Sequence, residues 1–282
     1  MNDQHKPSKD ERAKKREAMR AVPNPESRIR HVIGVVSGKG GVGKSIVTAL
    51  LASEIRSTGL NVGIIDADIT GPSIPKGFGV HTRMGGTDAG WIPEKTRSGI
   101  DIVSINLMLD QETDPVLWRG PLISNMVKKF YTDVVWNDID VLLVDFPPGT
   151  GDVAITFFQS VPLDGVVVVT SPQDLVSMIV AKAVNMARKM DVPVLGVVEN
   201  MSYFTCPDCH KSFNIFGKSK IDDVALEHGI DVLAKIPIDP ALASSYDKGL
   251  IEDAICPKMT EVASTVLGKL KDETGQGKGD AS

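Results

Sequence analysis

The chain has 282 residues and a formal net charge of -5, and 42% of its residues are hydrophobic. This acidic balance argues against general electrostatic binding to nucleic acid or anionic lipid, which depends on clustered Lys and Arg. No apolar run reaches the roughly 18 residues of a membrane-spanning helix, and the N-terminus lacks the hydrophobic core of a secretory signal. We therefore expect a cytoplasmic protein without nucleic-acid or membrane partners.

The two ends of the chain are predicted to lie outside the folded domain. Residues 1–27 are rich in Lys and Arg interrupted by acids, and we interpret them as a mobile charged tail, because charge-dense segments bury too little surface to become ordered. Residues 272–282 are interpreted as a disordered polar tail. The intervening residues 28–271 are expected to form one folded domain, for which their length is sufficient.

Short apolar runs recur along this domain, with helical patterns between them. They are rich in Val, Ile and Leu without alternation, which is typical of strands covered by helices on both faces. The fold predicted is therefore a doubly wound, mostly parallel α/β sheet, whereas the glycines and prolines between residues 71 and 99 predict a functional loop or small hairpin. The predicted strands are residues 31–36, 62–66, 100–105, 140–146, 165–170, 193–199 and 231–238.

A phosphate-binding loop follows the first predicted strand, in "SGKGGVGKS". It satisfies the pattern G-x-x-x-x-G-K-[ST], whose glycines let backbone N–H groups surround a phosphate at the start of a helix. Lys44 is predicted to neutralise the β- and γ-phosphate oxygens of ATP, and Ser45 to hold Mg2+ through its hydroxyl. The residues of this loop expected to bind the nucleotide are Gly38, Lys39, Gly40, Gly41, Val42, Gly43, Lys44, Ser45 and Ile46.

Lys39 is one lysine more than such a loop requires. It lies on the rim, where Lys44 already serves the phosphates, so its side chain would be idle in a monomer but would reach the partner's nucleotide across a two-fold interface. The loop "KGGVGKS" resembles the deviant Walker A loop of ATPases related to MinD, ParA, the nitrogenase iron protein and the arsenite and tail-anchor ATPases. That resemblance implies a closed homodimer in which Lys39 acts in trans; otherwise it is a solvated surface lysine.

Acidic residues close two of the predicted strands. Asp66 and Asp68 follow the second strand, where carboxylates can face the γ-phosphate and the attacking water, although either could instead cap the next turn. In the related families the second acid orients the water, which implies this role for Asp68. Asp145 ends "VLLVD", as expected of an Asp that holds Mg2+, and Gly149 resembles the switch glycine that senses the γ-phosphate. The residues expected to act in hydrolysis are Lys39, Lys44, Asp68 and Asp145.

Two segments near the last strands are predicted to lie beside the nucleotide base. Asn200 ends "VLGVVEN", and its amide can pair with an adenine edge through a donor and an acceptor, as an Asn at the matching place does in this superfamily. The alternative is a simple turn asparagine. The segment "IPID" ends the last predicted strand, and Pro237 and Asp239 are placed with Asn200.

Three cysteines are too few for a disulfide framework, so reduced thiols are expected. Cys206 and Cys209 form a C-x-x-C pair, which suits one metal centre but also fits a redox pair; its late position in a loop favours metal. Two thiolates do not complete a four-ligand site, whereas a dimer would bring two pairs together. Cys256 is interpreted as a small buried thiol.

The motifs together resemble the Mrp/ApbC family of iron–sulfur cluster carrier ATPases, over roughly residues 28–270. They are "SGKGGVGKS", "DADITGPS", "LWRGP", "VDFPPGTGD", "VVENMSYF" and "CPDCHKSFNIFG". The resemblance implies a homodimer that binds a 4Fe-4S cluster between its subunits through Cys206 and Cys209 and delivers it to apo-proteins, with slow ATP hydrolysis coupled to the transfer. A zinc-bridged targeting ATPase and a positional partitioning ATPase stay open as alternatives, because C-x-x-C spacing alone does not separate Zn2+ from a cluster.

Overall fold

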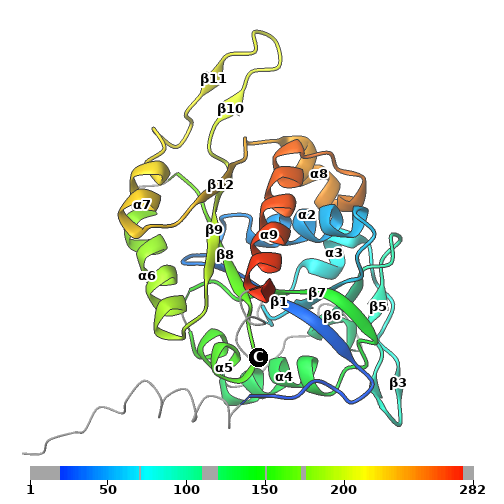
Figure 1. Ribbon diagram of the computed structural model, residues 1–282. Helices are drawn as coiled ribbons and strands as arrows, with labels where there is room; N and C mark the ends of the chain where they lie inside the picture. The colour runs from blue at the N-terminus through cyan, green and yellow to red at the C-terminus, as the bar shows by residue number, and fades with distance from the viewer. Residues whose placement is uncertain (1–19, 70, 110–119, 150, 173–175, 276–282) are drawn as a thin grey trace, which may run out of the picture.

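The computed structural model describes residues 20–275 except 70, 110–119, 150 and 173–175 (Figure 1). Seven strands match the seven predicted apolar runs: β1 (Arg28–Ser37), β2 (Val62–Asp66), β6 (Asp101–Ser104), β7 (Asp138–Asp145), β8 (Gly165–Thr170), β9 (Val194–Glu199) and β12 (Val232–Lys235). They pair in parallel in the order β12-β9-β8-β1-β7-β2-β6, and the short strand β5 (Glu94–Lys95) adds an antiparallel edge. The predicted doubly wound, mostly parallel α/β fold is confirmed.

Helices cover both faces of this sheet and enclose two separate cores. Successive strand residues point to opposite faces, so Val32 and Val36 lie in one core while Ile33 and Val35 lie in the other. One face is covered by α2 (Lys44–Ser57), α3 (Ile74–Phe78), α8 (Pro240–Asp247) and α9 (Pro257–Gly275). The other is covered by α4 (Gly120–Thr132), α5 (Asp152–Ser160), α6 (Val176–Lys189) and α7 (Ile221–His228). Short 3-10 turns, η1 (Ile105–Leu107) and η2 (Ile251–Asp253), complete the main elements.

The irregular segment between residues 71 and 99 contains α3 and a small antiparallel hairpin of β3 (Gly86–Thr87) and β4 (Gly90–Trp91). A small hairpin was one of the two predictions for this segment, and it is confirmed. The edge strand β5 was missed, because two residues are too short to produce a recognisable hydrophobic pattern.

The end segments are more ordered at their inner limits than predicted. The backbone N–H of Ala21 donates to Ser160 O at 2.6 Å, and the buried side chain of Asn24 donates to Ala89 O at 2.7 Å. Residues 20–27 therefore pack against the domain, held by polar contacts that hydrophobic patterning does not reveal. Helix α9 continues to Gly275, past the expected boundary at residue 272. Residues 1–19 and 276–282 lie outside the described part of the chain.

The parallel arrangement brings several loops to one edge of the sheet. The phosphate loop follows β1, Asp68 follows β2, and β9 leads through Asn200 into a hairpin of β10 (Phe204–Thr205) and β11 (Ser212–Phe213), which projects from the body (Figure 1). In open α/β sheets, ligands bind outside the carboxyl ends of the strands. Both groups of predicted site residues therefore lie at the edge where a ligand is expected. No helix in the described ranges is both long and apolar enough to cross a bilayer.

Candidate functional site

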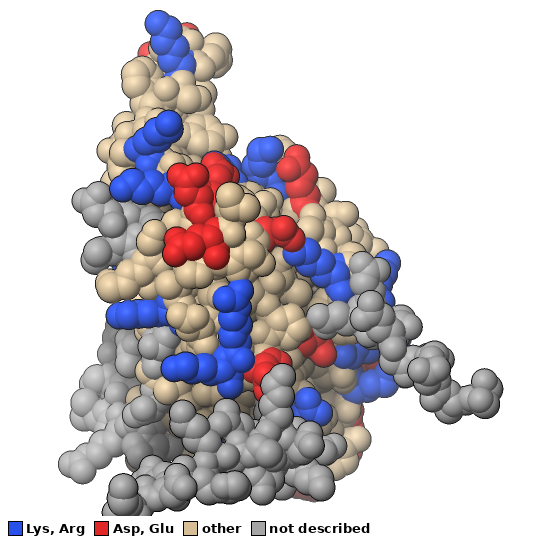
Figure 2. All heavy atoms as spheres, turned by 60° about the vertical axis from the view of Figure 1, so that its left-hand side comes forward, with Lys and Arg blue, Asp and Glu red and all other residues tan. Residues whose placement is uncertain are grey.

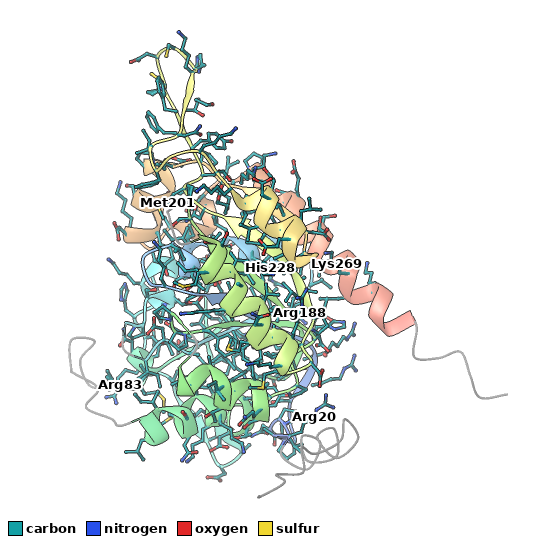
Figure 3. The ribbon with its side chains drawn as sticks, turned by 90° about the vertical axis from the view of Figure 1, so that its left-hand side faces the viewer. Arg20, Arg83, Arg188, Met201, His228 and Lys269 are labelled. Carbon is teal, nitrogen blue, oxygen red and sulfur yellow. The ribbon has the colours of Figure 1, made fainter. Side chains whose placement is uncertain are left out.

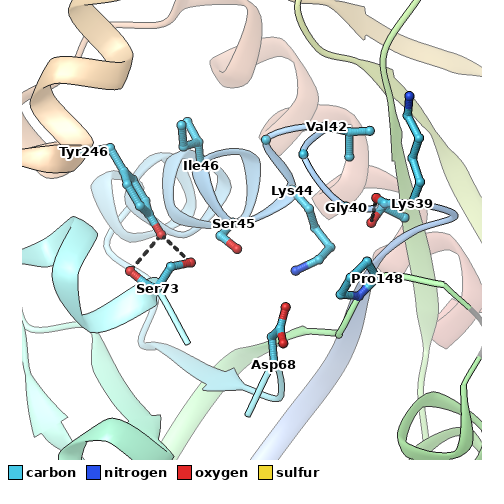
Figure 4. Close-up of a pocket in the computed structure, with 13 residues that line it drawn as sticks. Lys39, Gly40, Val42, Lys44, Ser45, Ile46, Asp68, Ser73, Pro148 and Tyr246 are labelled. Carbon is cyan, nitrogen blue, oxygen red and sulfur yellow. Dashed lines mark hydrogen bonds between the residues drawn. The ribbon is translucent and has the colours of Figure 1, made fainter. Parts of the chain in front are cut away.

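An open cavity of about 260 Å³ lies at the carboxyl edge of the sheet, and the loop between β1 and α2 forms one wall (Figure 4). Gly41 and Gly43 have φ angles of 78° and 76°, a left-handed conformation that favours glycine. Gly43 ends the loop at the N-terminus of α2, where the helix dipole favours an anion. The cavity is lined by Ser37, Lys39, Gly40, Gly41, Val42, Gly43, Lys44, Ser45, Ile46, Asp68, Ser73, Pro148 and Tyr246.

The carboxylate of Asp145 is the centre of a buried polar cluster behind this loop. Its Oδ2 lies 2.6 Å from Lys44 Nζ and accepts from the Ser45 hydroxyl at 2.7 Å, while Oδ1 accepts from the Thr48 hydroxyl at 2.5 Å. Asp145 is fully buried and Lys44 is 6% exposed, so each charge is compensated by the other. Ser45 and Asp145, the two oxygen ligands predicted for Mg2+, are therefore adjacent, and oxygen donors are the ligands that Mg2+ prefers. Thr48 is a part of the cluster that sequence reasoning missed.

Asp66 anchors the chain that follows β2. Its fully buried carboxylate accepts hydrogen bonds from the backbone N–H groups of Ser73 and Ile74 at 3.1 and 3.2 Å. Burial, with a further contribution from the charge of Asp145, raises the pKa of Asp66 to about 7. These contacts correspond to the turn-capping alternative for this residue, and they hold the segment that carries Asp68.

Asp68 and Lys39 occupy opposite sides of the cavity. The carboxylate of Asp68 points toward the ammonium of Lys44, whereas the side chain of Lys39 extends away from both (Figure 4). Asp68 Oδ1 also accepts from the N–H of Gly71 at 3.2 Å. The role of Lys39 toward a second subunit stays a prediction.

Five of the predicted nucleotide-binding residues do not line the cavity. They are Gly38, Gly149, Asn200, Pro237 and Asp239. The N–H of Gly149, predicted to sense the γ-phosphate, donates to Ser37 O at 2.8 Å, and Asp239 caps α8 by accepting from Ala241 N. The amide of Asn200 donates to Val42 O at 3.0 Å and fills the space in which a Cβ on residue 43 would lie. An adenine-binding role for Asn200, Pro237 and Asp239 stays a prediction.

Tyr246 is a cavity residue that sequence reasoning missed. It reaches the cavity from α8, and its hydroxyl donates to Ser73 O at 2.9 Å (Figure 4). Its ring packs on Gly77 of α3, where an added Cβ would lie only 2.3 Å from a ring carbon. Burial raises the pKa of Tyr246 well above its usual range, so the hydroxyl keeps its proton. No sequence pattern identified this residue, because an aromatic residue near a helix end commonly belongs to the core.

The cysteine pair lies at the outer end of the β10–β11 hairpin. The N–H of Cys206 donates to Lys211 O at 3.0 Å, and the N–H of His210 donates to Cys206 O at 2.9 Å. Cys209 is exposed and Cys206 is partly exposed, and backbone N–H groups of Cys209 and Asp208 lower the pKa of the Cys206 thiol. Over the described residues, no three His, Cys, Asp or Glu side chains are grouped to hold a metal ion. The hairpin therefore presents two accessible thiols.

Cys256 differs from this pair in both position and chemistry. It is buried, at 6% exposure, among the side chains of the core that contains α2 and α9. Burial raises the pKa of its thiol. The interpretation of Cys256 as a small buried thiol is confirmed.

Residues 28–271 match a ParA-type family model described as NUBPL iron-transfer P-loop NTPase. The chain is 43% identical to the iron-sulfur cluster carrier protein of Clostridium perfringens, over 80% of this chain and 82% of the relative. It is 44% identical to the protein of the same name from Methanocaldococcus jannaschii, over 79% of this chain and 78% of the relative.

Solved structures agree with this match. A nucleotide-binding protein of Archaeoglobus fulgidus in complex with ADP is 41% identical, with a TM-score of 0.74 over 82% of this chain and 90% of that one. The cell division ATPase MinD of Pyrococcus furiosus, 19% identical, has a TM-score of 0.58 over 85% of this chain and 99% of that one, and it shares the fold alone. The predicted resemblance is confirmed: the chain belongs to the ParA-type family of iron-transfer P-loop NTPases, in which its relatives are iron–sulfur cluster carrier proteins.

Proposed function

We propose that the protein is a homodimeric iron–sulfur cluster carrier that binds and slowly hydrolyses ATP. It takes one 4Fe-4S cluster between the Cys206 and Cys209 pairs of two subunits and transfers it to apo-proteins. The observation that carries this proposal is the accessible two-thiol half-site on a projecting hairpin, at the same sheet edge as a phosphate loop. The names of the relatives support the identity of the cargo.

The hairpin has the properties that a releasable cargo requires. A 4Fe-4S cluster takes four thiolate ligands, so two hairpins complete the set that one leaves half filled. The thiolate is the ligand form of cysteine, and the lowered pKa of Cys206 favours it at neutral pH. Because Cys209 is exposed, an acceptor's thiols can reach the cluster without unfolding of the carrier.

Each residue around the cavity has a distinct role in the proposed hydrolysis. Lys44 neutralises the β- and γ-phosphates of its own subunit's ATP. Its ammonium, which pairs with Asp145 in this structure, then pairs with phosphate oxygens. Ser45 and Asp145 hold Mg2+, which supplies positive charge to the phosphates. Asp68 orients the attacking water, and Lys39 contacts the nucleotide of the other subunit.

A short covalent and hydrogen-bonded path connects the two sites. Asn200 contacts the phosphate loop at Val42 O and lies four residues before the start of β10. The next residue, Met201, has a left-handed φ of 55° and lies near the foot of the hairpin (Figure 3). The N–H of Ile238 donates to Tyr203 O at 2.6 Å, which ties the foot of the hairpin to the segment that enters α8. Helix α8 in turn carries a tyrosine into the cavity. This path supports coupling between the nucleotide and the cluster.

Anaerobic reconstitution with iron and sulfide, followed by transfer to an apo-acceptor, tests the function. The wild-type protein is expected to take up iron and sulfide and to activate the acceptor, and Cys206→Ala is expected to lose both properties while still binding ATP. Cys256→Ala is the matched control, because its thiol is buried away from the hairpin and its loss should change neither property. A protein that holds one tight zinc ion, resists iron and activates no acceptor would instead be a zinc-bridged ATPase.

A further inference from the structure

Three large apolar side chains near the cysteine pair are exposed. Phe213, Ile215 and Phe216 are 47%, 58% and 44% exposed, within four consecutive residues. Phe213 ends β11, and Ile215 and Phe216 lie in a turn closed by a hydrogen bond from Gly217 N to Asn214 O at 3.1 Å. Other large exposed apolar residues of the described chain are dispersed over separate elements. A cluster of apolar residues on a projecting segment is typical of a protein contact surface.

This apolar patch, defined as Phe213, Ile215 and Phe216, is continuous with the face of the hairpin that carries Cys206. Phe213 pairs directly with Phe204, and Cys206 donates to Lys211 O one position beyond the Thr205 to Ser212 pair. Side chains of directly paired residues point to the same face of a hairpin, and so do side chains two residues apart on one strand. Cys206 therefore shares a face with Phe204, and Phe213 shares that face with both. A protein surface that approaches the Cys206 thiol from this face also covers Phe213.

The occupant that follows from the proposed carrier is a second copy of the chain. The hairpin offers two thiols, the described residues group no further metal ligands around them, and in the proposed dimer an identical hairpin supplies the second pair. A two-fold contact places the same surface of each copy against the other. We propose that the apolar patches of two subunits pack together beside the shared cluster and shield it from water. This inference rests on the proposed carrier function and adds the surface that makes the bridging site stable.

Cluster ligation makes this contact dependent on the cargo. Lys211 pairs with Cys206, Lys218 follows the patch, and Asp208 lies between the two cysteines, so the hairpin carries charges of both signs and offers no net attraction of its own for a second copy. Figure 2 shows Lys or Arg side chains on the projecting hairpin, away from the body of the molecule. A cluster with four thiolate ligands bonds to both hairpins and holds them together. The patches are therefore expected to associate in the loaded protein and to separate after transfer.

The double variant Phe213→Ser/Phe216→Ser tests the inference, with Leu226→Ser as the matched control. Leu226 lies on α7, outside the patch and the hairpin strands, and is 84% exposed, so its replacement removes exposed apolar surface from another element. After anaerobic reconstitution, the loss of cluster absorbance in air-saturated buffer and the dimer dissociation constant are measured for each protein. For the double variant, both the rate of cluster loss and the dissociation constant of the loaded dimer are expected to rise by about tenfold. The control should match the wild-type protein.

Three further results bear on the inference. Phe213→Leu/Phe216→Leu is expected to restore cluster lifetime, because it keeps the patch apolar, and ATP affinity should be unchanged in all variants. A double serine variant with wild-type lifetime and wild-type dimerisation, or one that only transfers its cluster more slowly to an acceptor, would show that the patch faces solvent or the client, and either would overturn the inference. Failure of the wild-type protein itself to take up iron would overturn the proposed function, and the inference with it.

Discussion

The cavity and the cysteine hairpin differ in how completely one chain satisfies their polar groups. In the cavity, buried Asp145 has an ammonium and two hydroxyl partners, and buried Asp66 is held by two backbone N–H groups. On the hairpin, Cys206 is partly exposed and Cys209 is exposed, and beside them lies an apolar patch. The contrast fits the proposal that the nucleotide site is formed mainly within one subunit, while the cluster site takes its ligands from two.

Lys44→Ala should have the largest effect on the cavity side of this comparison. We expect ATP affinity to fall by at least about a hundredfold, because the substitution removes the main charge opposing the phosphates. Calorimetric titration with ATP measures this loss. Because the same change leaves buried Asp145 without its ion partner, thermal unfolding is followed in parallel to separate weak binding from instability.

Lys39→Ala is the matched control for that variant, since it removes a lysine of the same loop whose side chain points away from the cavity centre. It should retain ATP binding and lose most hydrolysis, as expected of a charge that acts in trans. Equal losses of ATP affinity in the two variants would contradict the division of roles between the lysines.

Asp68→Asn and Asp145→Asn should slow hydrolysis for different reasons. The first is expected to lower the rate by about a hundredfold with Mg-ATP binding retained, because the water loses its orienting carboxylate. The second should weaken the dependence of ATP binding on magnesium, because it removes a charged oxygen ligand. Titrations with and without magnesium, together with phosphate release, distinguish the two. A normal rate for Asp68→Asn would show that another residue orients the water.

Cysteine alkylation compares the hairpin with the core directly. Iodoacetamide reacts with the thiolate, and at pH 7 this form is more populated for Cys206, whose pKa is lowered, than for Cys256, whose pKa is raised by burial. We expect Cys206 to be labelled at least about tenfold faster in the metal-free protein, as measured by mass spectrometry of its peptides. Equal labelling rates would contradict the assignment of Cys256 to the buried core.

Tyr246→Phe is expected to have the smallest effect. It removes the hydroxyl that donates to Ser73 O and keeps the ring that packs on Gly77, so the unfolding free energy should fall by only about 1 kcal/mol. If this bond positions the segment after Asp68, the hydrolysis rate drops several-fold while ATP affinity is unchanged. Tyr246→Leu, which also removes the ring, should lower the unfolding free energy further. A wild-type rate for Tyr246→Phe would assign the residue to packing alone.

The parts of the molecule that the sequence predicts are those with a strong local pattern. Continuous apolar runs identified the seven parallel strands, and loop chemistry identified the stretch from Lys39 to Ile46 that lines the cavity. Tyr246 and Thr48 were missed because their roles arise from tertiary contacts with α3 and β7, which leave no spacing signature. The packing of residues 20–27 was missed for the same reason, since isolated polar contacts hold it.

Asn200 and Gly149 are both predicted to lie beside the nucleotide, and the structure shows which partners they have within the chain. The amide of Asn200 donates to Val42 O, and the N–H of Gly149 donates to Ser37 O, so both contact the phosphate loop or the strand before it. A sequence motif indicates which residue types occur near a ligand. It does not show whether their N–H groups donate to the ligand or to carbonyl oxygens of the same chain. Their roles toward ATP stay predictions.

The central claim is that two chains together complete the cluster site, and native mass spectrometry of the anaerobically reconstituted protein tests it most directly. The account predicts a dimer that carries a single cluster of about four iron and four sulfide ions, the composition of that cluster type. Cys209→Ala is expected to appear without this added mass, and Cys256→Ala to retain it. A monomer that carries a complete cluster, or a dimer that carries one zinc ion and no sulfide, would contradict the account.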